Sequence, residues 1–276
     1  MPQLSASTLK LFQECPRCFW LHLNKKIERP RGPFPSLPSG IDRVLKGYFE
    51  TYRRRGILPP LIDGKLEGTL ATNALTLGFN DASTHARLWG KLDDCVILPD
   101  RRLAPLDHKT RASAPEDVSY SEKYYKFQMD VYTLLLERNG HRTSRTAYLV
   151  YYFPVDGKLH EGFPFEVAVH TITTDPDAAY EVFAAACRCL ANPLPRSGEA
   201  CEFCRWADAR PPAGAASAQE RGAPVPPRTG GGSAAQADAL VASPRSTRTR
   251  SSPSPRHARP SGPTVSAGQV PDDLFS

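Results

Sequence analysis

The stretch that decides the fold class is GKLDDCVILPDRRLAPLDHKT, residues 90–110. Residues 90–98 are typical of a β-strand, residues 99–102 are typical of a turn, and residues 103–110 return as a second strand. The sequence therefore predicts a β-hairpin. Its second strand is largely apolar, so a carboxylate within it is expected to be paired or bound to a metal ion.

Three charged side chains of this hairpin are expected to form one patch. Side chains alternate between the two faces of a strand, so Asp107 and Lys109 point the same way. A turn centred on residues 100–101 places Asp93 beside Asp107 or His108, roughly 5 Å away. Two carboxylates with one ammonium form a divalent-metal site that cleaves phosphodiesters. Taken alone the pattern has low specificity, because acidic and basic residues alternate on many solvated strands.

The remaining elements predict a mixed sheet flanked by helices, in one α/β (α+β) domain over residues 1–209. A Pro-rich loop is expected at residues 29–40, and Gly56 is expected to end the second helix. Predicted helices run from Ser5 or Ser7 to Cys15, over residues 41–55, from Ser119 or Ser121 to Arg138, and from Asp175 to Leu190; further strands cover residues 146–153 and 163–172.

Residues 210–276 differ in composition from the rest of the chain. They contain 11 of the 27 prolines, a glycine run and one aromatic residue, Phe275. Such a segment buries too little apolar surface to offset its ordering entropy, which predicts a disordered tail. The tail has 8 Arg and 4 acidic residues, so it carries +4 of the chain's net +6 and leaves +2 for residues 1–209. A strongly basic folded surface is therefore not expected.

Targeting signals and membrane spans are not expected from the sequence. The N-terminus lacks a basic-then-apolar signal pattern, and no apolar run approaches the roughly 20 residues that span a membrane. The seven cysteines then point to a reducing compartment, in which paired cysteines favour a metal site over disulfides. A cytoplasmic location is the expectation.

Several motifs, taken in order, give the chain a family resemblance. They are Leu4 to Ser7 with Cys15-Pro16-Arg17, the strand ending in Leu92-Asp93, Leu106 to Thr110, Gln128-x-x-x-Tyr132 and Cys201-x-x-Cys204. In this order the chain resembles the PD-(D/E)XK nuclease superfamily, in its RecB-type and CRISPR-associated RecB-like branch. The resemblance covers about residues 4–206. It implies a restriction-endonuclease-like core and metal-dependent cleavage of DNA.

The resemblance also assigns roles to individual residues. Asp93 and Asp107 would bind Mg²⁺ or Mn²⁺, with the backbone carbonyl of His108 as a further ligand. Lys109 would orient the attacking water or stabilise charge in the transition state. Gln128 would position the water or the phosphate, and Tyr132 would support Gln128.

One metal ligand of the branch has no clear counterpart. RecB-type members usually place a metal-binding His or Glu on the helix before the hairpin, whereas this helix offers Asp42 and Glu50 and no His. Asp42 is the candidate for this role, and its alternative is a solvated or helix-capping residue. If neither acid joins the site, a catalytically inactive nucleic-acid-binding module of the same fold becomes the alternative function.

Two C-x-x-C pairs bracket the predicted domain. Cys15, Cys18, Cys201 and Cys204 could form a four-thiolate site for Zn²⁺ or an iron–sulfur cluster, with a structural role. RecB-like nucleases with clusters typically use one early and three late cysteines, so Cys18 would replace a late ligand that is missing at Arg210. The resemblance gives a [4Fe–4S] cluster a slight preference over zinc. The other cysteines, Cys95, Cys187 and Cys189, are expected in the core.

Other features suggest partners and further surfaces. Tyrosines near the start of the predicted Gln128 helix suit packing better than stacking on single-stranded bases, and Arg53, Arg54 and Arg55 read as a solvated surface. No P-loop motif is present, so ATP-driven unwinding would need a separate helicase, which leaves an accessory subunit as another alternative. Residues 269–276 resemble peptides that dock on replication clamps. The leading hypothesis is a DNA nuclease, an exonuclease or single-strand-directed enzyme, in repair, recombination or defence.

Overall fold

The computed structural model describes residues 1–32, 36–72 and 76–209. Its helices are α1 (Ala6–Glu14), α2 (Pro16–Lys25), α3 (Ser36–Arg53), α4 (Val118–Arg138), α5 (Pro176–Ala191) and α6 (Glu202–Asp208), with a short 3₁₀ turn η1 (Leu159–Glu161). Its strands are β1 (Gln3–Leu4), β2 (Thr69–Leu70), β3 (Thr76–Asp81), β4 (Ala86–Lys91), β5 (Asp94–Ile97), β6 (Leu103–Thr110), β7 (Thr146–Pro154) and β8 (Phe165–Thr173).

Two mixed sheets organise these strands. One has the order β2-β5-β6-β7-β8, in which β6 and β7 are parallel and the other neighbours are antiparallel. The other has the order β1-β4-β3, in which the short β1 pairs parallel to β4. The mixed α/β class predicted from the sequence is therefore confirmed.

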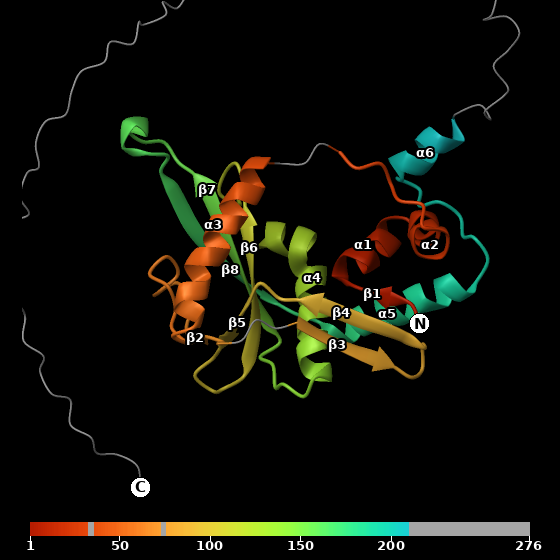
Figure 1. Cartoon of the computed structure of the whole chain (residues 1–276), viewed down its shortest axis with the longest axis horizontal. Coiled ribbons are helices and arrows are strands. Elements are labelled where there is room, and N and C mark those ends of the chain that lie inside the picture. Colours follow the sequence, from red (N-terminus) through yellow and green to blue (C-terminus); the bar gives the residue numbers. More distant parts are fainter. Residues whose placement is uncertain (33–35, 73–75, 210–276) are drawn as a thin grey trace, which may run out of the picture. The chain divides into compact units, whose positions relative to one another are not determined.

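Helices α3 and α4 pack on opposite faces of the larger sheet (Figure 1). Phe49 of α3 contributes to one apolar core with Leu106 and Val150. Met129 of α4 contributes to the other core, which includes Leu149 and Tyr151. Successive residues of β6 and β7 therefore point into different cores, as the alternation of side chains along a strand requires. This division decides which side chains of β6 can meet α4.

The predicted hairpin forms, but its first strand is interrupted. Sheet pairing joins β5 to β6 with Asp94 opposite Leu106, as a turn centred near residue 100 requires. The expected strand 90–98 is wrong as a single element: the chain leaves β4 at Lys91, bends at Leu92 and Asp93, and enters the other sheet as β5. Leu92 is buried at this bend, so it anchors the crossing between the two sheets.

The helix predictions need three further corrections. Helix α3 begins at Ser36, so part of the expected Pro-rich loop is helical. Helix α2 starts directly at Pro16, because proline is tolerated in the first helical turn, and Cys15 caps it. Helix α6 follows α5, which was expected to be the last helix. The Ser5 cap of α1 is confirmed, with a complete capping box to Thr8.

The described residues contain no helix that is long and apolar enough to cross a membrane. The predicted disordered tail and its clamp-like end, residues 210–276, lie outside the described residues.

Candidate functional site

Asp107 and Lys109 lie on the face of β6 that α4 covers. Lys109 Nζ lies 2.5 Å from Asp107 Oδ2 and donates a hydrogen bond to Gln128 Oε1 at 3.1 Å. Gln128 Nε2 donates to Asp107 Oδ1 at 2.9 Å and to the Tyr132 hydroxyl at 2.9 Å. Two residues of one strand and two residues one turn apart on α4 therefore form a closed polar network.

The Asp107 carboxylate is suited to binding a cation. Burial raises the pKa of Asp107, the Lys109 ammonium opposes this shift, and the nearby Asp93 carboxylate adds to it. Oδ2 is buried and lies 2.5 Å from Lys109 Nζ, which leaves a second lone pair of this oxygen free to bind a cation. A buried carboxylate oxygen with spare acceptor capacity, next to a second carboxylate, fits a hard divalent cation. The carboxylate oxygens of Asp93 and Asp107, the ligands expected from the sequence, therefore suit a divalent cation chemically.

Asp93 lies in the bend between β4 and β5, directly beyond the last pair of the β5–β6 ladder. Continuing the register places it opposite Asp107, as expected from the sequence. Its carboxylate is only partly buried, and its backbone carbonyl accepts a hydrogen bond from Arg53 Nη2 at 3.3 Å. Arg53 therefore fixes the bend that presents Asp93.

Asp42, Asp93 and Asp107 do not form a compact group of possible metal ligands. The four cysteines are the only group of three or more potential ligand residues, among those that the structure describes, whose ligand atoms lie within 4.8 Å of one another. Instead, Asp42 Oδ2 accepts a hydrogen bond from Lys46 Nζ at 2.8 Å, one turn along α3. Asp42 also lines a cavity of about 230 Å³ with His108 and Thr110.

Lys46 is a residue of this region that sequence reasoning missed. Asp42 raises the pKa of Lys46, and the charges of Asp93 and Asp107 act in the same direction. The Lys46 ammonium therefore lies in the electrostatic field of all three carboxylates. The i, i+4 spacing of Asp42 and Lys46 indicates their pairing, but nothing in the sequence indicates that Asp93 and Asp107 act on Lys46.

The His108 side chain belongs to a buried network on the opposite face of β6. His108 Nε2 lies 3.0 Å from Asp94 Oδ2, and Nδ1 lies 3.0 Å from the Tyr152 hydroxyl. Arg53 Nε donates to Asp94 Oδ1 at 2.7 Å, and the Phe49 ring packs on the imidazole. The imidazole therefore lies on the face of β6 opposite to Asp107 and is held by these contacts. The backbone carbonyl of His108 remains as its candidate metal ligand. Arg53 is buried, so the prediction that it lies on a solvated surface is wrong.

The two cysteine pairs meet in space, as predicted. Sulfur–sulfur distances are 3.7 Å for Cys15 and Cys204, 3.6 Å for Cys18 and Cys201, and 3.5 Å for Cys18 and Cys204. All four side chains are buried. Figure 1 shows the helices that border them, α1, α2 and α6, in the same region of the molecule. The group can bind a metal ion. Cys95, Cys187 and Cys189 lie outside it, in or against the core, as expected.

Hydrogen bonds favour the thiolate form at one corner of this group. Burial alone would raise the pKa of Cys15, but the backbone N–H groups of Gly198 and Cys18 donate to its Sγ and lower the pKa to about 6. Arg29 Nη2 also donates to Cys201 Sγ, at 3.6 Å. Burial, together with the neighbouring thiols, raises the pKa of Cys204. A bound cation would favour the thiolate at every position.

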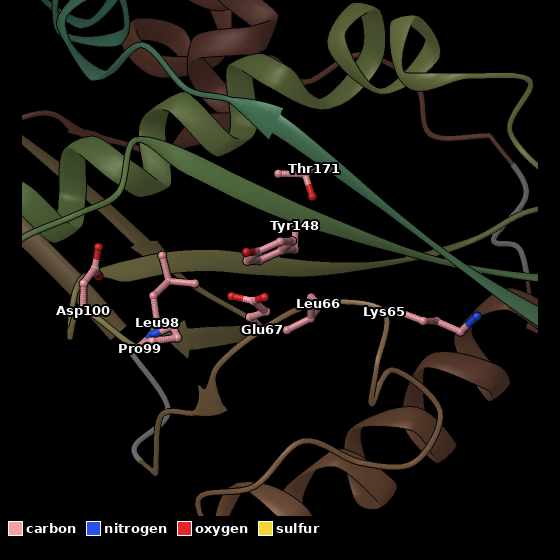
Figure 2. A pocket seen from close by; sticks show the side chains of 8 residues that line it. All are labelled: Lys65, Leu66, Glu67, Leu98, Pro99, Asp100, Tyr148 and Thr171. Atoms are coloured by element: carbon pink, nitrogen blue, oxygen red, sulfur yellow. The ribbon is translucent and has the colours of Figure 1, made fainter.

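A separate cleft of about 440 Å³ lies between residues 65–67, the β5–β6 turn, β7 and β8. Figure 2 shows the Glu67 side chain beside the Tyr148 ring within it. Neither Asp93 nor Asp107 lines this cleft, so the carboxylate site is distinct from it.

Comparison with known proteins identifies the family. The model of the PD-(D/E)XK nuclease superfamily matches residues 62–209, more than half of the chain. The chain belongs to this superfamily. PD-(D/E)XK proteins are typically nucleases that use divalent metal ions, and the mixed sheet with flanking helices agrees with their restriction-endonuclease-like fold. The matched range includes Asp93, Asp107 and Gln128 but excludes Asp42.

Comparison with solved structures and curated proteins adds little to this assignment. Among the solved structures that match, one described as "Crystal structure of SSO0001" aligns with 76% of this chain and 85% of that chain, at 16% identity and a TM-score of 0.41. At this TM-score the similarity supports no argument about function. No curated protein matches the chain significantly.

Proposed function

We propose that this chain is a divalent-metal-dependent DNA nuclease of the RecB-type branch, with its reaction centre at Asp93, Asp107 and Lys109. The observation that carries the proposal is the Asp107 carboxylate, buried on β6 and held between Lys109 at 2.5 Å and Gln128 at 2.9 Å. In a member of a nuclease superfamily, such a costly buried charge is best explained by metal-assisted catalysis.

Each residue of the network has a separate proposed task. Mg²⁺ or Mn²⁺, bound by Asp93, Asp107 and the His108 carbonyl, would polarise the scissile phosphate and lower the pKa of the attacking water. Lys109 orients that water and stabilises negative charge on the phosphate. Gln128 fixes the positions of Asp107 and Lys109 at once, and Tyr132 accepts its second N–H. Burial raises the pKa of Tyr132 to about 12, so its hydroxyl stays protonated.

Asp42 is the proposed further metal ligand from α3. Its carboxylate is half-exposed, and the pair that it forms with Lys46 is accessible to solvent, with side-chain exposures of 47% and 56%. Exposed pairs of this kind contribute little free energy, roughly 0–1 kcal/mol, so the pair can open at small cost. Lys46 would then face the phosphate backbone.

The same pair favours a second candidate function. With Lys46 paired to Asp42, the described residues provide no group of three carboxylates whose oxygens all lie within 4.8 Å of one another. A chain that keeps this arrangement would bind nucleic acid without cleaving it, either alone or as an accessory subunit of a helicase. Binding of DNA by the wild-type chain without any cleavage would favour this alternative.

The four cysteines are proposed to bind one structural metal ion. Zn–S bonds of about 2.3 Å in a tetrahedron imply sulfur–sulfur separations of about 3.8 Å, close to the 3.5–3.7 Å found here. In a [4Fe–4S] cluster each cysteine binds a different iron atom, so the sulfurs lie farther apart. The distances thus favour Zn²⁺ over the cluster that the resemblance slightly preferred. Iron and zinc analysis with a visible absorption scan tests this proposal.

We further propose that the enzyme acts as an exonuclease or on single strands, in DNA repair, recombination or defence. A helicase is the proposed partner for unwinding, and a replication clamp is a second one through residues 269–276. A pull-down with and without these eight residues tests the clamp: equal recovery would exclude it. The thiol pairs favour a reducing compartment such as the cytoplasm.

Variants of the reaction centre provide the main test. Asp107→Asn and Lys109→Ala are each expected to lower the cleavage rate by at least about 100-fold, because each removes a charge that acts on the reacting phosphate. The assay uses 5′- and 3′-labelled single- and double-stranded DNA with Mg²⁺, with Mn²⁺, or without either. Asp100→Asn, in the exposed turn of the same hairpin, and Lys91→Ala are matched controls expected to cleave normally. Unchanged rates for both Asp107 and Lys109 variants would refute the assignment.

A further inference from the structure

Three tyrosines form a continuous aromatic surface on the first turns of α4, next to the reaction centre. The rings of Tyr120 and Tyr124 have centroids 4.6 Å apart, and those of Tyr120 and Tyr125 are 6.1 Å apart. Tyr125 is half-buried and packs against Tyr151 of β7. Tyr124, by contrast, is 45% exposed. Packing therefore explains the inner ring of this group but not the outer one.

Each of these rings has a cation beside it. Lys109 Nζ lies 4.5 Å from the centre of the Tyr125 ring, Arg111 Cζ lies 3.8 Å from that of Tyr120, and Lys123 Nζ lies 5.2 Å from that of Tyr124. Cation–π attraction accounts for the pairing. The inner cation, Lys109, is the one that contacts Asp107. The row of rings and cations thus leads from the reaction centre to the surface.

The two outer cations are not neutralised by carboxylates. Within the described part of the chain, neither Arg111 nor Lys123 forms a salt bridge, and Arg111 Nη1 is buried without a hydrogen-bond partner. The nearby acid Asp117 is used as the N-cap of α4, where it accepts from Ser119. Glu122 lies two residues before Tyr124 and so on a different side of the helix. Two positive charges without a carboxylate partner therefore lie beside the partly buried Tyr120 ring and the exposed Tyr124 ring.

We propose that this surface, Tyr120, Tyr124, Arg111 and Lys123, binds a single strand of DNA and delivers it to Lys109 and Asp107. A base stacks on the exposed Tyr124 ring, and phosphates pair with the guanidinium and the ammonium. Bases within a duplex have both faces covered by their neighbours, so this surface selects unpaired strands. The inference rests on the proposed nuclease function and deepens it by naming the residues that bind the single strand.

Tyr124→Ala tests the stacking contact in the full-length chain with metal bound at the four cysteines. Fluorescence anisotropy would measure the Kd for a fluorescein-labelled 20-nucleotide oligothymidylate and for a 20-base-pair duplex, without added Mg²⁺ or Mn²⁺. We expect Tyr124→Ala to raise the Kd for the single strand by about 5- to 100-fold, the range for loss of one stacked base, and to change the Kd for the duplex by less than twofold. Tyr124→Trp should restore single-strand binding. Lys123→Gln should reduce the slope of log Kd against log salt concentration by the contribution of about one phosphate contact.

Trp89→Ala is the matched control, because Trp89 is a similarly exposed aromatic residue at 40%. It lies on the opposite face of β4 from Gly90, whose absent Cβ faces Leu135 of α4. Its removal should leave both Kd values unchanged.

The outcomes separate the inference from the proposed function. Tyr124-dependent binding of the single strand by a chain that does not cleave would support the surface and refute the nuclease. Cleavage by the wild-type chain with single-strand binding unaffected by Tyr124→Ala would refute the surface and leave the nuclease standing. Failure of the wild-type chain to bind the single strand, or an equal effect of Trp89→Ala, would also overturn the inference.

Discussion

Arg53, Arg54 and Arg55 are consecutive arginines with different surroundings. The Arg53 side chain is 10% exposed and pairs with Asp94, which is 2% exposed, whereas Arg54 is 76% exposed and pairs with Glu50. Nothing in the sequence separates the three. Arg53 faces inward because α3 lies against β5 and β6, where Asp94 and the Asp93 carbonyl need a donor.

Arg53→Met is therefore expected to be strongly destabilising. Among the described residues it leaves the buried Asp94 carboxylate with His108 as its one side-chain partner, and loss of one member of a buried ion pair typically costs about 3–5 kcal/mol. Urea unfolding followed by circular dichroism would measure the change in the free energy of unfolding. Arg54→Met, on the exposed side of the same helix, should cost less than about 1 kcal/mol. Equal effects of the two substitutions would contradict the proposed role of Arg53.

Other residue-level features could be predicted from the sequence. The common face of Asp107 and Lys109 follows from the period of a strand, and the pairing of Gln128 with Tyr132 follows from the period of a helix. Both depend on neighbours within one element. The meeting of Gln128 with Asp107 depends on how α4 packs on β6, which the sequence indicated only through the family resemblance.

At the level of elements, the segment after α5 owes its position to a glycine. Gly198 packs so closely on the end of α1 that an added Cβ would lie 2.5 Å from the Glu14 carbonyl oxygen and 3.2 Å from Cys15 Cα. Its N–H donates to Cys15 Sγ at 3.2 Å. Backbone cannot yield as a flexible side chain does, so only glycine fits here. The close approach brings α6 and its two cysteines to α1 and α2.

Gly198→Ala is expected to displace this segment and weaken the cysteine site. The purified variant should contain less metal per chain and release it faster to a chromogenic chelator, because Cys15 loses the N–H that favours its thiolate. Gly47→Ala provides a control that is expected to stabilise the chain without affecting the cysteine site. Gly47 lies on the exposed side of α3 with nothing near its Cβ position, so alanine should stabilise the chain by roughly 0.5–1 kcal/mol and leave the metal content unchanged. Normal metal retention by Gly198→Ala would contradict the role of this contact.

The boundary between β4 and β5 could not be predicted from the sequence, because it depends on which strands pair. Residues 90–98 have the composition of one strand, and each half is indeed extended. The bend at Leu92 and Asp93 arises because β4 pairs with β1 and β3 while β5 pairs with β2 and β6. Strand pairing is a long-range choice, and it brings Asp93 to the point where the two sheets diverge.

Across the folded unit, the cysteine group joins the two ends of the described chain. Cys15 and Cys18 belong to the first helices, and Cys201 and Cys204 belong to the last segment. A metal ion bound there stabilises the folded state by the free energy of its binding, since the unfolded chain does not hold four thiolates together.

Metal removal is therefore expected to lower the Tm of the whole unit by several degrees or more. Treatment with a high-affinity zinc chelator, followed by differential scanning calorimetry, would measure the shift, and Cys204→Ser should reproduce it. Cys189→Ser, a cysteine outside the group, should retain the metal and the Tm. An unchanged Tm after complete metal removal would show that the four cysteines do not stabilise the fold through a metal.

The sequence by itself determined the α/β class, the hairpin that carries Asp107 and Lys109, the order of motifs and the two cysteine pairs. These are properties of local periodicity and spacing, which a chain displays before it folds. Only the tertiary structure decided that Asp93 lies at a bend between two sheets and that Lys46 forms a salt bridge with Asp42. It also decided that Arg53 and His108 pack on the face of β6 opposite to Asp107, and that the tyrosines of α4 lie beside Lys109. Those relations join residues of different elements, and packing of helices on both faces of the sheet sets the distances between them.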